Sequence, residues 1–160
     1  MEARSNIHKI LNTKEILTKM ERFCAYQERC EQDVRKKLLS FSLPSSETDK
    51  VIDALIDGNY INEARFAKLF VSGKFRIKHW GRIKIKSELR KRRISENCIA
   101  EAMKEIDEAE YINTVQQLLN KQINLSNNKI NHDLRVKIAR YLQSKGFEQQ
   151  LVMDELNQIK

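Results

Sequence analysis

A run of cations from Lys74 to Arg93, with the sequence KFRIKHWGRIKIKSELRKRR, is the stretch of this chain whose residue types best suit a binding chemistry. Ten of its twenty residues are Lys or Arg, and Glu88 is its only acid. The whole chain has a formal net charge of +8, so the other 140 residues together sum to −1. Because basicity confined to one stretch indicates a site and not a general adjustment of solubility, this stretch predicts a surface that binds a polyanion.

A short helix would arrange these cations in two rows. Ile85 and Leu89 lie four residues apart, which is the spacing of one apolar helical stripe. At about 100° per residue, one flank of that stripe collects Arg82, Lys86, Arg90 and Arg93, and the other collects Lys84 and Lys91. Solvated basic faces usually interleave Glu for pairing, and this stretch almost lacks it. We therefore favour a polyanion site over a basic face without a partner.

The candidate residues for binding a polyanion form a principal group and an additional group. The first is Lys78, Arg82, Lys84, Lys86, Arg90, Lys91, Arg92 and Arg93, and the second is Arg65, Lys74, Arg76 and Trp80. Trp80, the only tryptophan, could stack on a nucleobase or insert into a partner, but we favour a core-filling role in which Gly81 lets the backbone approach closely. Arg65 could contact DNA or a partner, but its neighbours Asp57 and Glu63 favour an internal ion pair.

Composition predicts an all-α fold and argues against several function classes. One proline and four glycines in 160 residues are typical of helices joined by short turns. The chain has no paired carboxylates at metal spacing, no Ser/His or Cys/His set and no phosphate-binding glycine loop, so we expect no enzyme activity. The three cysteines form no CxxC pair and the histidines are scattered, so we expect reduced thiols, no metal and no cofactor. No apolar run suits a signal or a membrane span, so we expect a cytoplasmic protein.

The helical pattern recurs three times along the chain. Aligned apolar positions are Val34, Ile85 and Ile138, then Leu38, Leu89 and Leu142, then Leu43, Ile94 and Phe147. We therefore predict three tandem three-helix repeats over residues 13–61, 62–107 and 108–160, preceded by a loosely ordered tail over residues 1–12. Because each repeat would pack mainly on its neighbours, we expect an elongated, curved molecule.

The central repeat resembles the most specific motif of a known family. Residues 58–94, GNYINEARFAKLFVSGKFRIKHWGRIKIKSELRKRRI, are similar to the central segment of the RecX family of bacterial recombination regulators. The shared features are the Ala-Arg-Phe-Ala segment at 64–67, the pair Trp80 and Gly81, and an Ile-x3-Leu helix. The outer repeats resemble the family's first and third repeats more weakly, so the likeness covers nearly all of the chain after residue 13.

The resemblance implies a function that composition and spacing do not. A RecX-like protein would bind the recombinase RecA, lodge in the groove of its filament on single-stranded DNA, and modulate recombination, DNA repair and the SOS response without catalysis. We expect such a protein to act as a monomer. The alternative is a nucleic-acid-binding or architectural protein that acts without RecA.

Two departures from the family pattern predict local weakness. Cys30 stands where the first repeat usually has a serine helix cap, so we expect the start of that helix to be frayed. Ser72 and Gly73 replace residues that are more usually long and basic. Because glycine within a helix costs about 1 kcal/mol relative to alanine, we expect the helix that includes Gly73 to bend or end early there.

Overall fold

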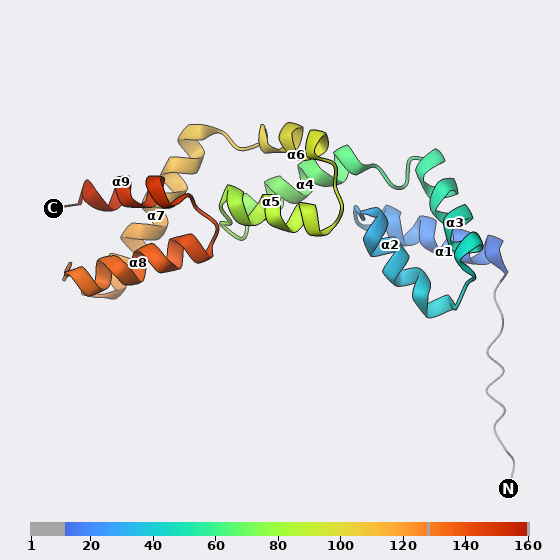
Figure 1. Ribbon diagram of the computed structural model, residues 1–160, viewed down its shortest axis with the longest axis horizontal. Coiled ribbons are helices and arrows are strands. Elements are labelled where there is room, and N and C mark those ends of the chain that lie inside the picture. The colour runs from blue at the N-terminus through green and yellow to red at the C-terminus, as the bar shows by residue number, and fades with distance from the viewer. Residues whose placement is uncertain (1–11, 128, 160) are drawn as a thin grey trace, which may run out of the picture. The chain divides into compact units, whose positions relative to one another are not determined.

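Every regular element of the computed structural model is a helix in the residues that it describes, 12–127 and 129–159 (Figure 1). The elements are α1 (Thr13–Tyr26), α2 (Glu31–Leu38), the 3-10 helix η1 (Leu39–Phe41), α3 (Ser45–Asp57), α4 (Glu63–Arg76), α5 (Arg82–Lys91), α6 (Glu96–Met103), α7 (Glu108–Leu125), α8 (His132–Ser144) and α9 (Gln149–Asn157). The predicted all-α class is confirmed. Within the described ranges, no helix is both long and apolar enough to cross a membrane.

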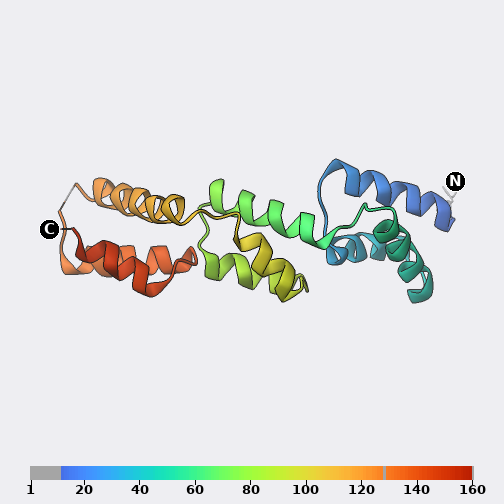
Figure 2. The same ribbon diagram turned by 90° about the horizontal axis from the view of Figure 1, so that it is seen from above.

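The helices pack in groups of three, and in each group the third helix contacts the other two. Helix α3 packs on α1 and α2, α6 packs on α4 and α5, and α9 packs on α7 and α8. Both views show α8 and α9 side by side (Figures 1 and 2). The predicted tandem three-helix repeats are thus confirmed as the fold.

The chain separates into two compact units, the first ending at Asn62 and the second beginning at Glu63. The predicted domain boundaries after residues 61 and 107 stay predictions, as does the elongated, curved outline. The predicted tail over residues 1–12 lies outside the described residues except for Asn12. The Asn12 side chain accepts a hydrogen bond from Glu15 N–H at 2.9 Å and caps α1.

The middle helix of each repeat is built on the same plan. The aligned apolar residues Val34, Ile85 and Ile138 are all buried, as are Leu38, Leu89 and Leu142. Each middle helix is followed by one residue in the left-handed region, at equivalent positions: Ser42, Arg93 and Gly146. Such a residue ends a helix and redirects the chain. The apolar residue that comes next, Leu43, Ile94 or Phe147, then packs inward, with Leu43 the least buried of the three.

Two expected weak points are stronger than the sequence suggested. Helix α4 continues through Gly73 to Arg76, so the predicted early end at that glycine is wrong. Helix α2 begins directly after Cys30, whose N–H donates to the Asp33 carboxylate at 3.3 Å. That acid supplies half of a reciprocal cap, which offsets the missing serine hydroxyl.

The basic helix α5 is held in the fold by Ile85 and Leu89, which are both fully buried. We expect Leu89→Ala to lower the free energy of unfolding by about 2–5 kcal/mol, because it removes buried methyl groups and leaves a cavity. Ser87→Ala, an exposed change on the same helix, should alter it by no more than about 0.5 kcal/mol. Urea denaturation followed by circular dichroism measures both values. Equal effects of the two substitutions would contradict the packing role of Leu89.

Candidate nucleic-acid interface

A short connection between α4 and α5 positions the centre of the candidate site. His79 takes a left-handed conformation, with φ of 53°, and its N–H donates to the Phe75 carbonyl at 3.0 Å. Trp80 N–H donates to the Lys74 carbonyl at 3.1 Å, and Gly81 N–H donates to the Lys145 carbonyl at 2.8 Å. Successive backbone amides in this connection are therefore hydrogen-bonded. These bonds hold the backbone in place and so fix the direction in which the Trp80 side chain extends.

Trp80 lies at the surface between two lysines. Its ring is half-buried, with the Lys84 ammonium 4.5 Å and the Lys74 ammonium 4.9 Å from the ring. Lys78 is exposed in the same connection. We call these four residues the Trp80 patch. The favoured interpretation of the sequence was a Trp80 ring that fills the core. The structure instead leaves the indole partly exposed, with two cations beside it.

The arginines that the sequence predicts as site residues are paired with acids. The ion pairs join Arg76 to Glu110 (3.2 Å), Arg82 to Glu108 (2.6 Å), Arg90 to Glu96 (2.7 Å), and Arg92 to Glu88 (3.0 Å). Lys91 also pairs with Glu88, at 2.8 Å, and hydrogen bonds from Lys91 and Arg92 lower the pKa of Glu88. Three of these four acids belong to α6 or α7, outside the basic stretch, so the local scarcity of glutamate did not reveal them.

Apart from Lys91, the lysines of the stretch behave differently. Of the residues that the structure describes, none forms an ion pair with Lys74, Lys78, Lys84 or Lys86. The charges of Lys74, Lys78 and Lys84 are therefore available to an anion, whereas the pKa of Glu96 is lowered by its hydrogen bond with Arg90 and also by the charge of Lys86. The arginine charges are largely offset within the fold. Arg65 is half-buried on α4, and its predicted ion pair stays a prediction. Arg93 occupies the left-handed turn after α5.

Tyr111 at the start of α7 joins the second repeat to the third. Its hydroxyl accepts a hydrogen bond from Arg82 N–H at 2.9 Å and donates one to the Glu148 carboxylate at 2.7 Å. Its ring packs between Phe75 and Phe147, with centroid distances of 5.7 and 5.3 Å. Burial raises the pKa of Tyr111, so the hydroxyl keeps its proton and the donor role is fixed.

Two glycines let the turn between α8 and α9 lie against the start of α5 (Figure 1). A side chain at Gly81 would overlap the backbone of Gly146, and one at Gly146 would overlap Lys84. The Gly146 carbonyl accepts a hydrogen bond from Ile83 N–H at 3.0 Å. This contact places Lys145 next to the patch, where its ammonium donates to the Lys78 carbonyl at 3.0 Å. Sequence reasoning identified the close approach at Gly81 but missed Lys145 and Tyr111.

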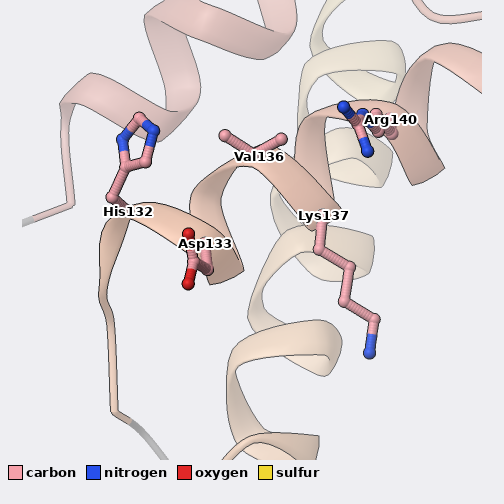
Figure 3. Close-up of a pocket in the computed structure, with 5 residues that line it drawn as sticks. All are labelled: His132, Asp133, Val136, Lys137 and Arg140. Atoms are coloured by element: carbon pink, nitrogen blue, oxygen red, sulfur yellow. The ribbon is translucent and has the colours of Figure 1, made fainter.

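The described residues also include a surface pocket on α8 and two buried thiols. A pocket of about 580 Å³ is lined by His132, Asp133, Val136, Lys137 and Arg140, all on α8 (Figure 3). Within residues 12–127 and 129–159, no group of three His, Cys, Asp or Glu side chains could hold a metal ion. Burial raises the pKa of the Cys24 and Cys30 thiols to about 11, so both are protonated and unreactive near neutral pH.

The fold and the site together define an all-helical protein of tandem three-helix repeats with a cationic central repeat. A family model described as RecX, second three-helix domain, matches residues 62–103, the repeat that contains the Trp80 patch. The chain is similar to the RecX family, as the sequence resemblance indicated.

Individual relatives show the same similarity. The regulatory protein RecX of Clostridium tetani is 31% identical over 141 residues, which are 86% of this chain and 64% of that protein. The regulatory protein RecX of Prosthecochloris aestuarii is 24% identical over 148 residues, 92% of this chain and 95% of that protein. That of Lactobacillus johnsonii is 25% identical over 84% of this chain, which spans only about half, 51%, of that protein.

Solved structures share the fold. A crystal structure of a regulatory protein RecX superposes with a TM-score of 0.81 at 20% identity, covering 91% of this chain and 72% of that one. The crystal structure of RecX from Lactobacillus salivarius gives a TM-score of 0.79 at 22% identity, covering 92% and 96%.

Because of the contacts of Arg82, we expect removal of its side chain to lower the free energy of unfolding. Its guanidinium lies 4.0 Å from the Tyr111 ring and pairs with the exposed Glu108. Adding a cation–π contact to a solvent-screened ion pair, we expect Arg82→Ala to lower the free energy of unfolding by about 1–2 kcal/mol. Lys86→Ala, on the same helix but without an ion pair in the described residues, should change it by at most about 0.5 kcal/mol. Parallel urea titrations test the difference, and equal values would show that Arg82 has no structural role.

Proposed function

We propose that this protein is a non-enzymatic, cytoplasmic regulator of homologous recombination that binds RecA filaments on single-stranded DNA and modulates the recombinase. Similarity to the RecX family supports the RecA partner. The observation that carries the DNA contact is the set of lysines without ion pairs around Trp80, in the repeat that the family model matches. The chain acts as a monomer in this proposal.

The chemistry of the site suits phosphates that carry no base information. Lysine ammonium groups are compact point charges on flexible stems, so they can follow a backbone of variable conformation. Phosphate contacts of this kind position a protein on nucleic acid without reading its sequence. A regulator of a filament that forms on any single-stranded DNA requires this sequence tolerance.

A co-sedimentation experiment tests the RecA partner. RecA filaments are assembled on single-stranded DNA with a non-hydrolysable ATP analogue, and this protein is added at levels well below the DNA concentration. We expect it to pellet with the filaments and to lower the DNA-dependent ATPase of RecA in a parallel assay with ATP. Matched samples lack either RecA or DNA. Pelleting with DNA alone to the same extent would favour the alternative, a nucleic-acid-binding protein that acts without RecA.

A salt titration tests the lysines. Each phosphate neutralised on single-stranded DNA contributes about −0.7 to the slope of log K against log salt, so three to five contacts predict a slope of about −2 to −3.5. We expect the double variant Lys84→Gln, Lys86→Gln to reduce that magnitude by up to about 1.4 for all DNA sequences alike. Lys121→Gln, Lys137→Gln makes the same charge change on exposed positions of α7 and α8 and should leave the slope unchanged. Equal loss in both double variants would show that only net charge matters.

A further inference from the structure

The environment of Trp80 suggests more than a tryptophan that fills space. Of the described residues, those with a ring contact to Trp80 are Lys74 and Lys84, and both bring an ammonium group to the indole. Lys78 and Lys145 add two further charges, joined by the hydrogen bond from Lys145 to the Lys78 carbonyl. The two ammonium groups on the ring and the two on neighbouring residues repel one another, and an anionic ligand would relieve this repulsion.

We propose that Trp80 is a base-stacking platform, that the lysines around it hold the flanking phosphates, and that Lys145 of the third repeat completes the subsite. The ligand is one unstacked nucleotide of a single-stranded nucleic acid. This inference rests on the proposed function, because it assigns the residues by which the protein contacts DNA. It adds a direct contact with a base and a contribution from a second repeat.

The lysines also explain how the ring is kept available. A lysine stem has four methylene groups, so Lys74 and Lys84 can swing from the indole to a phosphate without moving the backbone. In the free protein the ammonium groups make cation–π contacts with the indole ring. A phosphate carries a full negative charge, so it attracts these groups more strongly than the ring does. The arriving base then replaces the cations on the ring. Stacking on an aromatic side chain tolerates any base, which suits a protein that must bind without sequence preference.

The backbone around the subsite is held in place, so that it does not need to be ordered by the ligand. Gly81 N–H donates to the Lys145 carbonyl, and Trp80 N–H donates to the Lys74 carbonyl. The close approach of Gly81 and Gly146 fixes the end of α8 against the start of α5. Lys145 is therefore positioned by the same contact that positions Trp80.

Because Trp80 is the only tryptophan, its fluorescence reports on this ring alone. The wild-type protein is titrated with a short oligothymidylate and with an abasic oligonucleotide of the same length and charge. We expect saturable quenching by oligothymidylate and little quenching by the abasic strand, although both bind. Equal quenching by the two strands, or binding of oligothymidylate without quenching, would overturn the stacking role and leave only a phosphate site.

Substitutions separate stacking from charge. Trp80→Leu should weaken oligothymidylate binding by about 5- to 150-fold, the range typical of one stacked base, and bring its affinity close to that of the abasic strand. Trp80→Phe keeps an aromatic face and should retain most of the preference for the strand with bases. The ratio of the two affinities is the readout, since partial unfolding of a variant lowers both alike. A ratio that Trp80→Leu leaves unchanged would overturn the proposal.

The third-repeat contribution has its own test. Lys145→Gln should reduce the magnitude of the salt slope by up to about 0.7 for both strands, whereas Lys137→Gln, on the α8 pocket of Figure 3, should not. An unchanged slope in Lys145→Gln would remove Lys145 from the subsite. If oligothymidylate does not bind but the protein still sediments with RecA filaments, the subsite is wrong and the proposed function stands. If oligothymidylate quenches Trp80 but the protein does not sediment with RecA filaments, the proposed function is wrong and the subsite stands.

Discussion

The close backbone approach between Gly81 and Gly146 is the constraint on which the candidate site depends. Neither position has room for a side chain, and Gly146 in addition has a φ of 94°, which other residues rarely adopt. The approach allows Gly81 N–H to reach the Lys145 carbonyl and Ile83 N–H to reach that of Gly146. The start of the basic helix is thereby held from outside its own repeat, and the orientations of Trp80 and Lys84 follow from it.

The fold gives most arginines of the basic stretch acidic partners and leaves the lysines near Trp80 without ion pairs in the described residues. Arginine presents a planar fork that pairs well with carboxylates, and Arg82 and Arg90 pair in this way with Glu108 of α7 and Glu96 of α6. Lysine is a point charge on a flexible stem, and the lysines of the Trp80 patch remain outside this network of acids. A stretch that looks uniformly basic in sequence thus contains a structural set of arginines and a smaller set of lysines available to a ligand.

Local features of the site were predictable from sequence, and its long-range contacts were not. The helical state of α5 and the burial of Ile85 and Leu89 follow from helical spacing, which depends only on residues a few positions apart. The partners of Arg82 and Lys78 lie 26 and 67 positions away, at Glu108 and Lys145, and periodicity carries no information on such pairs.

The repeats show why one turn can serve two purposes. Ser42, Arg93 and Gly146 occupy the same left-handed position after the middle helix of their repeats. Serine and arginine accept that conformation at a cost of about 1–2 kcal/mol, because there the turn need only end a helix. In the third repeat the turn also contacts the start of α5, where a side chain would overlap Lys84, so only glycine fits. The turn after the middle helix is thus common to all three repeats. In the third repeat, because Gly146 has no side chain, this turn also packs against the second repeat and completes its surface.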